Sequence, residues 1–213
     1  MSKIYRVNKI LEEQINTNSK IDNLLWKQAN VITDFCSPWE EEKLINTEFR
    51  ALWDNKRLYF HFKVYDPKIH IHSSIDTNDS INNSDRVELF FRKNESLNPY
   101  YCLEIDPTPR IMDFKALPNR QFDFNWNWPQ KDILINSCIE KKFFTVEGYL
   151  SIDSLKAFNL IKNNRIEVGV YRAKYKRQKG GMYKPIWITW VNPKTEIPNF
   201  HIASSFGVFE LQE

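Results

Sequence analysis

A strict two-residue alternation between residues 57 and 65 constrains this chain more than any other feature. Apolar side chains stand at every second position: Leu58, Phe60, Phe62 and Val64 alternate with Tyr59, His61, Lys63 and Tyr65. Successive side chains of a β-strand point to opposite faces, so this pattern predicts a strand with one buried face. Residues 47–53 are also typical of a strand, and Asp54-Asn55 between the two runs is a turn dipeptide. Together they predict a β-hairpin.

Similar segments recur along the whole chain. They cover residues 86–92, 99–106, 111–116, 133–139, 143–150, 166–175, 185–190 and 206–211. Helix signals are limited to residues 151–158, where Ser151 is an N-cap candidate, and to a short stretch at 24–29. Short strands without regularly alternating helices predict an all-β fold. We expect one domain over residues 1–213, a two-sheet antiparallel β-sandwich of jelly-roll or immunoglobulin-like type with one or two short helices.

Charge balance and cysteine distribution exclude several classes of protein. The 213 residues carry 30 basic and 27 acidic side chains, a net charge of +3, which is too balanced for nucleic acid to be the main partner. Cys36, Cys102 and Cys138 are odd in number and far apart, so we expect buried free thiols. The N-terminus lacks the apolar core of a secretion signal, and no stretch is apolar enough to cross a membrane. We therefore expect a cytoplasmic protein without a membrane partner.

Two long irregular stretches, 67–84 and 118–131, are where binding residues are expected, because long loops in compact domains are often binding loops. The second contains Trp126 and Trp128, which share one face if the segment is extended. Flat aromatic rings suit the C–H patches of a pyranose, so both tryptophans are predicted to stack on a sugar. The alternative is that they cover one end of the core.

Four segments, in serial order, resemble the family 9 carbohydrate-binding modules, in the branch of short stand-alone proteins of the DOMON-like superfamily. They are FRALWDNKRLYF at 49–60, SDRVELFF at 84–91, YYCLEIDP at 100–107, and an ending made of VYR at 170–172, WVNP at 190–193, NFHI at 199–202 and SFG at 205–207. Together they span roughly residues 20 to 211. The resemblance implies a β-sandwich that binds sugars.

The resemblance also implies where a sugar is held. Family members grip it between two tryptophans, and the corresponding positions here hold Asn82 and Phe200. Glu88 aligns with a family glutamate that accepts hydrogen bonds from sugar hydroxyls. Tyr171 and Lys184 align with polar sugar contacts.

Four polar side chains in the matched segments are predicted to bind hydroxyl groups. They are Glu88, Glu104, Arg172 and His201. Carboxylates accept strong charge-assisted hydrogen bonds, and an arginine can form a forked contact with vicinal hydroxyls. His201 could donate to a ring oxygen or satisfy a loop carbonyl. For the two glutamates the alternative is an ion pair with Arg86, Arg110 or Arg172.

Two stretches contain residues of metal-ligand type. His70 and His72 share one face of an extended segment, but no third ligand is evident, so solvated loop histidines are expected. Residues 76–85 lack the glycine and glutamate of a calcium loop, so a polar loop is predicted. No cofactor is expected. The alternative, suggested by the family, is a structural calcium near Asp76, Asp79 and Asp85.

Residues 174–184 form a basic segment with Gly180-Gly181 at its centre, which predicts a hairpin. Basic residues beside aromatic ones can bind nucleic acid or acidic glycans. Exposed lysines that prevent association of sheet edges explain the same pattern, and we favour that explanation.

The function that these features predict is non-catalytic binding of a mono- or oligosaccharide, linked to polysaccharide breakdown. Net gains of about 0.5–1.5 kcal/mol per hydroxyl contact predict micromolar to millimolar affinity. One alternative is a glycoside hydrolase or accessory protein that uses Glu88 and Glu104 as paired carboxylates. Another is a haem-binding relative of the same sandwich, ligated through Met112, Met182 or His201. A pure interaction domain is the last.

Overall fold

The computed structural model describes residues 3–11, 24–41, 44 and 46–213, and β-strands are the main regular structure among these residues. The strands are β1 (Ile4–Lys9), β2 (Thr47–Trp53), β3 (Arg57–Val64), β4 (Arg86–Arg92), β5 (Tyr100–Ile105), β6 (Ile111–Leu117), β7 (Gln121–Asp123), β8 (Ile133–Ile139), β9 (Phe144–Ser151), β10 (Ile161–Lys162), β11 (Arg165–Arg177), β12 (Tyr183–Thr189) and β13 (Gly207–Leu211). The helices are α1 (Thr77–Asn82) and α2 (Ile152–Ala157), and the 3-10 turns are η2 (Leu25–Gln28), η3 (Pro118–Arg120), η4 (Gln130–Asp132) and η5 (Ala203–Ser205). The predicted strands and both predicted helical segments are confirmed, whereas β1, β7, β10 and α1 are additions.

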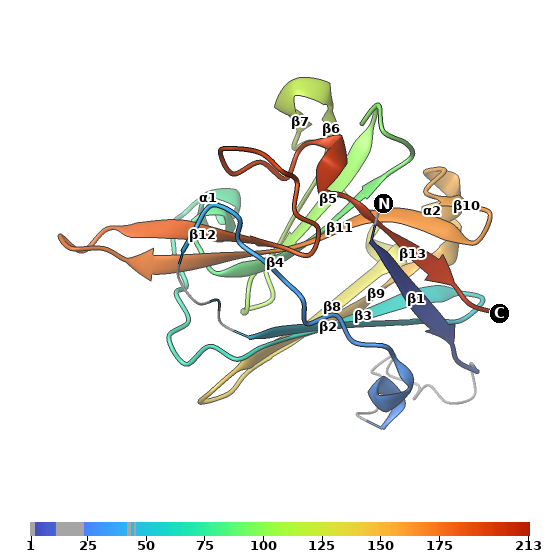
Figure 1. Cartoon of the computed structure of the whole chain (residues 1–213), viewed down its shortest axis with the longest axis horizontal. Helices are drawn as coiled ribbons and strands as arrows, with labels where there is room; N and C mark the ends of the chain where they lie inside the picture. Colours follow the sequence, from blue (N-terminus) through green and yellow to red (C-terminus); the bar gives the residue numbers. More distant parts are fainter. Residues whose placement is uncertain (1–2, 12–23, 42–43, 45) are drawn as a thin grey trace.

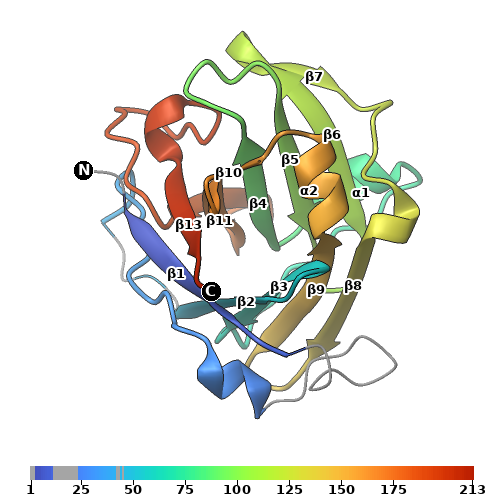
Figure 2. The same cartoon turned by 90° about the vertical axis from the view of Figure 1, so that its right-hand side faces the viewer.

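The strands form one curled sheet, in the order β7-β6-β5-β4-β11-β13-β1-β2-β3-β9-β8, with β10 and β12 paired to β11 beside this path. Figure 2 shows its two halves facing each other, with β1 at the joint. Ile4–Val7 of β1 pair with β13, and Asn8–Lys9 pair with β2. Both pairings are parallel, while the other strand pairs of the described residues are antiparallel. The sheet is therefore mixed and joined by β1, which corrects the prediction of two separate antiparallel sheets.

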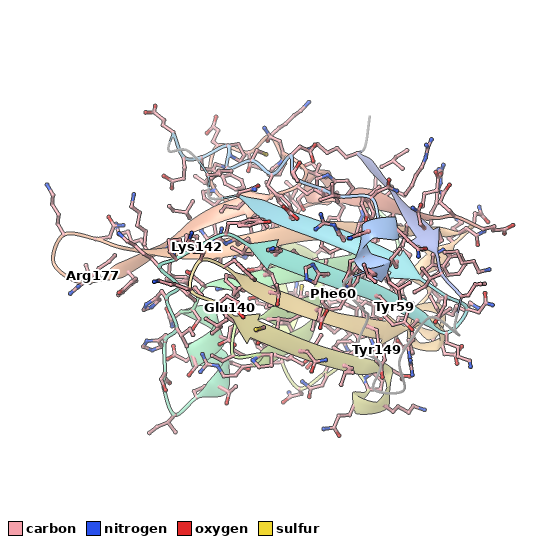
Figure 3. All side chains as sticks on the ribbon, turned by 90° about the horizontal axis from the view of Figure 1, so that it is seen from below. Tyr59, Phe60, Glu140, Lys142, Tyr149 and Arg177 are labelled. Atoms are coloured by element: carbon pink, nitrogen blue, oxygen red, sulfur yellow. The ribbon has the colours of Figure 1, made fainter. Side chains whose placement is uncertain are left out.

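The main core lies between the two halves and is filled by alternate residues of the facing strands. Leu58, Phe60, Phe62 and Val64 of β3 are all buried in it, as their alternation predicts. Burying each such side chain contributes about 1.5–3 kcal/mol. The polar face of β3 is also partly covered, because Leu25 and Trp26 of η2 pack over Tyr59. Tyr59 lies beside Tyr149 of β9 on this face, with ring centroids 6.1 Å apart (Figure 3).

β4 is buried on both of its faces, which sets the position of the functional site. Every one of its seven residues is buried. Val87, Leu89 and Phe91 enter the main core, so Arg86, Glu88 and Phe90 point to the outer face of the sheet. A second apolar cluster, which includes Phe90, covers that face together with the chain between β12 and β13. The charged side chains of β4 thus lie beneath other parts of the chain, where they require partners.

β11 and β12 form a hairpin that protrudes from the body of the domain (Figure 1). Gly180 and Gly181 at its end have φ of 98° and 90°, a left-handed conformation that favours glycine. The predicted hairpin at 174–184 is confirmed, and Arg177 is exposed near its end (Figure 3).

All three cysteines are free, but only Cys102 is buried; Cys36 is half-buried and Cys138 is exposed. The expectation of three buried thiols is therefore wrong for Cys138, which lies on the edge strand β8. No helix among the described residues has the length and hydropathy that a membrane span requires.

Candidate functional site

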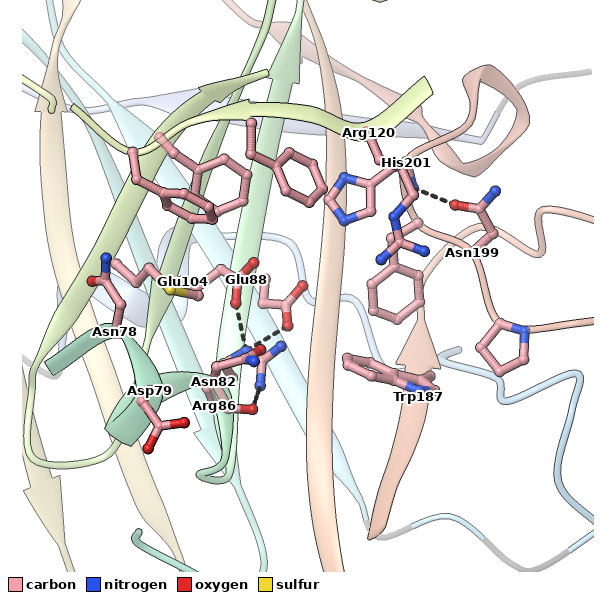
Figure 4. Close-up of a pocket in the computed structure, with 16 residues that line it drawn as sticks. Asn78, Asp79, Asn82, Arg86, Glu88, Glu104, Arg120, Trp187, Asn199 and His201 are labelled. Carbon is pink, nitrogen blue, oxygen red and sulfur yellow. Dashed lines mark hydrogen bonds and ion pairs between the residues drawn. The ribbon is translucent and has the colours of Figure 1, made fainter. Parts of the chain in front are cut away.

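A cavity of about 330 Å³ opens on the outer face of the half-sheet that contains β4, β5 and β6 (Figure 4). Residues from these strands, from α1, η3, β7 and β12, and from the loop before β13 line it. Small-molecule sites in proteins usually measure about 300–1,000 Å³. A volume at the lower end of this range suits one small ligand.

The floor of the cavity is a cluster of three charged side chains from two neighbouring strands. The register of β4 and β5 places Glu88 directly opposite Glu104, and Arg86 shares their face because it lies two residues before Glu88. Arg86 Nε lies 2.9 Å from Glu88 Oε1 and 2.6 Å from Glu104 Oε2. The side chains are only 3% (Arg86), 1% (Glu88) and 6% (Glu104) exposed. Arg86 Nη1 also donates to the carbonyl of Asn82, 2.9 Å away, which ties the floor to α1.

These charge contacts leave hydrogen-bonding capacity unused. The direction of the Arg86 Nε–H fits neither carboxylate oxygen, so within the described part of the chain Glu88 Oε1 and Glu104 Oε2 accept no hydrogen bond. Buried polar atoms without hydrogen bonds are rare in folded proteins, and each one costs about 1–3 kcal/mol. Two acceptors of this kind show that the protein itself does not fully satisfy the hydrogen-bonding capacity of the cavity floor.

The two glutamates share a single cation, and this alters their protonation. Burial, reinforced by the negative charge of Glu104 and opposed by Arg86, raises the pKa of Glu88 to about 8. Burial also raises the pKa of Glu104, against the effect of Arg86. Near neutral pH Glu88 is therefore mostly protonated. A protonated carboxyl can donate a hydrogen bond as well as accept one, whereas an ionised carboxylate only accepts.

Aromatic side chains form two walls on either side of this floor. Phe114, Phe122 and Phe124 come from β6, β7 and the residue after it, while Trp187 and Phe200 come from β12 and the loop that follows. In the sheet order β6 and β12 lie on opposite sides of β4, so the two groups flank the charged cluster. The rings of Trp187 and Phe200 are perpendicular, with centroids 5.5 Å apart.

The rim of the cavity is polar. Asn78, Asp79 and Asn82 from α1, Arg120 from η3, and Asn199 and His201 from the loop before β13 lie along it (Figure 4). His201 Nδ1 lies 2.9 Å from the hydroxyl of Tyr100. Burial, together with the charges of Arg120 and Arg86, lowers the pKa of His201 to about 3. His201 is therefore neutral at physiological pH.

The structure brings five of the predicted site residues together. Asn82, Glu88, Glu104, Phe200 and His201 all line the cavity. Asn82 and Phe200 are the two positions that the resemblance assigns to the aromatic clamp. The predicted alternative for the glutamates also holds, because both contact Arg86.

Two other predicted residues lie near the cavity without lining it. Tyr171 is fully buried beneath Phe200, with the rings stacked at 4.2 Å and 10°, and its hydroxyl contacts Ser205. It supports the wall rather than touching the space inside. Lys184 is exposed on β12 three residues before Trp187, so the two side chains point to opposite faces of the strand.

Arg172 does not line the cavity, so its position does not agree with the prediction that it binds the ligand. Arg172 follows Tyr171 on β11 and therefore points to the opposite face, into the interior. Its Nη2 lies 2.7 Å from Asp66 Oδ2, and the two side chains are 0% and 1% exposed. Lys174 joins the same cluster through contacts of 2.8 Å to Asp66 and 2.9 Å to Asp85. We therefore assign Arg172 a structural role.

Trp126 and Trp128 also lie outside the cavity, contrary to the prediction that they stack on a sugar. Trp128 is only 3% exposed, belongs to the main core, and donates its indole N–H to Ser154 Oγ at 3.0 Å. Trp126 packs against Tyr101 and Phe158 at the same end of the core. The alternative reading, in which both tryptophans cover one end of the core, is the one that their positions support.

Several cavity residues are missing from the prediction. Arg86 could have been found from its i, i+2 relation to Glu88, which puts both on one strand face. The sequence gives no local signal for three others, Trp187, Arg120 and Phe122. These residues approach the cavity only through strand pairing and reversals of the chain direction. Met112, one of the predicted haem ligands, lines the same cavity as His201, whereas Met182 is exposed in the β11–β12 hairpin.

The residues considered as metal ligands have other partners. Asp76 is the N-cap of α1 and accepts from the amides of Asn78 and Asp79, so residues 77–82 form a helix where a polar loop is predicted. Asp85 is buried against Lys174. His70 stacks on Tyr183 with centroids 3.6 Å apart. No group of three or more His, Cys, Asp or Glu side chains is placed to hold a metal ion among the described residues. The absence of a cofactor stays a prediction, with a structural calcium as its alternative.

The curled β-fold, with a cavity that has a charged floor and aromatic walls, places this chain among β-domains built to bind a small polar ligand. A family model described as "Carbohydrate family 9 binding domain-like" matches residues 18–213. The chain belongs to this family, and the assignment made from its sequence motifs is confirmed. No curated protein matches the chain.

Solved structures with low sequence identity share the fold. A candidate carbohydrate-binding protein from Bacteroides uniformis ATCC 8492 is 15% identical with a TM-score of 0.74, and the match covers all of both chains. A family 9 carbohydrate-binding module from Caldicellulosiruptor kristjanssonii in complex with glucose is 16% identical with a TM-score of 0.61, covering 99% of this chain and 96% of that one. A family 9 carbohydrate-binding module from the same organism in complex with cellotriose is 15% identical with a TM-score of 0.62. This match covers 99% of this chain and 94% of that chain.

Proposed function

We propose that this chain is a non-catalytic carbohydrate-binding protein and that the cavity above Arg86, Glu88 and Glu104 holds one sugar unit of a mono- or oligosaccharide. Family membership and the glucose and cellotriose complexes of structural neighbours support the ligand class. The observation that carries the choice of site is the cavity of about 330 Å³ with the cluster of Arg86, Glu88 and Glu104 as its floor and aromatic side chains as its walls. Sugar hydroxyls would donate hydrogen bonds to the carboxyl groups of this floor.

The walls of the cavity suit the apolar side of a sugar. Pyranose rings present C–H patches to flat aromatic faces, and Trp187 offers such a face together with a polar N–H group. Phe200 is fixed from behind by its stacking on Tyr171, 4.2 Å away. Since a fixed ring loses little side-chain entropy when the ligand arrives, it contributes more of its contact energy to binding.

Calorimetric or NMR titration with glucose, cellotriose and a panel of other mono- and oligosaccharides tests this proposal. We expect at least one dissociation constant between micromolar and millimolar. Loss of the stacking contact in Trp187→Leu should weaken that affinity about five- to tenfold. The matched control is Trp126→Leu, which removes a tryptophan outside the cavity and should leave the affinity unchanged. Silence across the panel, or loss of affinity with Trp126→Leu alone, would contradict the proposal.

A hydrolase is the second candidate, because Glu88 combines a raised pKa with a neighbouring carboxylate. Glycosidases place the scissile bond between two carboxyl groups. Here the guanidinium of Arg86 lies between them and contacts both. We therefore expect no release of reducing sugar from oligosaccharides by the wild type. Hydrolysis that disappears in Glu88→Gln would establish the enzyme instead.

A further inference from the structure

We propose that the saccharide bound in this cavity is acidic and that its carboxylate binds Arg120. This inference rests on the proposed function and narrows its ligand class to sugars that carry a carboxylate, such as uronic acids. Arg120 lies at the end of η3 and lines the cavity beside His201 (Figure 4).

Among the described residues Arg120 has no acidic partner, in contrast to Arg86 at the floor. Within the described ranges of the chain, no carboxylate lies at ion-pair distance from its guanidinium and no hydrogen bond engages it. Its nearest specific contact is the ring of Phe122, whose centroid lies 6.0 Å away, the outer limit for a cation–π interaction. The planar guanidinium has five N–H donors and matches a carboxylate in a forked geometry.

The backbone holds this arginine in an unfavourable conformation. Asn119 and Arg120 have φ of 61° and 59°, consecutive residues in the left-handed region. Asparagine enters that region with some ease, but arginine does so rarely. Backbone strain of this kind is concentrated at functional sites, where it fixes the direction of a side chain. Here the strained turn sets Arg120 at the edge of the cavity.

Of the two arginines that line the cavity, Arg86 contacts both glutamates, whereas Arg120 contacts no carboxylate of the described residues. Burial raises the pKa of both Glu88 and Glu104, which reduces the negative charge at the floor beside Arg86. His201 is neutral. Asp79 lies on α1, across the cavity from Arg120 (Figure 4). A ligand carboxylate is therefore attracted to the side of the cavity that contains Arg120 and repelled from the side that contains Glu104. In this orientation the hydroxyl groups of the sugar face the carboxyl groups of the floor.

The test compares sugars that differ only at one carbon, namely glucose with glucuronic acid and galactose with galacturonic acid. Each is used as the free sugar and as the methyl glycoside. The affinities are measured by calorimetric titration at pH 7 in low and in high salt. We expect at least one uronic acid to bind about tenfold more tightly than its neutral counterpart, with an advantage that shrinks in high salt. Arg120→Gln should remove that advantage and change the affinity for the neutral sugar less than twofold. Arg120→Lys should restore part of it. Lys184→Gln, which removes an exposed cation outside the cavity, should change neither affinity.

The two proposals fail in different ways. If neutral sugars bind as well as the uronic acids and Arg120→Gln has no effect, the acidic ligand is ruled out while carbohydrate binding stands. If Lys184→Gln removes the uronic acid preference as fully as Arg120→Gln does, the preference comes from general surface charge and the inference is wrong. If no sugar of the panel binds, both proposals fall.

Discussion

Replacing Arg86 by methionine should lower the free energy of unfolding by about 3–5 kcal/mol at pH 8, because the variant buries two glutamates without a cation. Arg86 is the only side chain of the described residues that forms an ion pair with Glu88 or Glu104. The loss should depend on pH. Without Arg86 the folded-state pKa of both glutamates lies above the unfolded value of about 4.3, so stability is fullest below that value and falls as the pH rises through the folded-state pKa. Urea denaturation at pH 5 and pH 8 measures the difference.

Arg177→Met is the matched control for this prediction. Arg177 is exposed near the end of the β11–β12 hairpin (Figure 3), so its replacement should change the free energy of unfolding by less than about 0.5 kcal/mol. A loss below 1 kcal/mol in Arg86→Met at pH 8, or a loss that is the same at pH 5, would show that the two carboxylates do not depend on Arg86.

Glu104→Gln should weaken sugar binding about ten- to hundredfold. Glu104 is the more open of the two glutamates, and hydrogen bonds to charged groups contribute about 1.5–3 kcal/mol. The variant should still fold, because Glu88 remains beside Arg86 and can take the negative charge. Calorimetric titration with the best ligand of the panel, together with a thermal melt, separates lost binding from lost structure.

Glu88→Gln is the informative comparison, because below pH 8 the glutamate that it replaces is mostly protonated. A protonated carboxyl and an amide both donate and accept, so the affinity at pH 6.5 should change less than about threefold. Above pH 8 the wild type loses the proton of Glu88 and should bind more weakly, whereas Glu88→Gln should not. If Glu88→Gln and Glu104→Gln both lost affinity to the same large extent at pH 6.5, the assignment of the proton to Glu88 would be contradicted.

The sequence predicts the strands well because their patterns are local. The alternation in β3 and the hairpin with β2 depend only on neighbouring residues, and both occur where predicted. β1 is missed because its two buried residues, Tyr5 and Val7, form too short a pattern. Its parallel pairing with β2 and β13 depends on contacts between the two ends of the chain. The curl of the sheet is therefore not predictable from local patterns.

The candidate site is predicted in part for a similar reason. Glu88 and Glu104 fall in matched motifs, and the antiparallel register of β4 and β5 brings them opposite each other. Trp126 and Trp128 are misassigned because an aromatic-rich loop does not reveal which side of the sheet it covers. Trp187 is overlooked because its place beside Arg86 follows from two successive strand pairings, β12 with β11 and β11 with β4.

The α1 helix shows where a local signal was available. Asp76 caps the helix through the amides of Asn78 and Asp79, and Asp79 adds negative charge to the first turn. The polar composition of residues 76–85 concealed this cap. The helix matters for function, since Asn82 at its end accepts from Arg86 and borders the cavity.

The most direct test of sugar binding in this cavity is an NMR titration that follows the indole N–H resonances of the seven tryptophans. Trp187 is the tryptophan in the cavity wall, whereas Trp128 lies in the main core and Trp126 packs against that core. We expect the Trp187 resonance to shift with saturation as sugar is added while those of Trp126 and Trp128 stay in place. A saturable shift of Trp126 or Trp128 with Trp187 unmoved would place the sugar elsewhere and contradict the account.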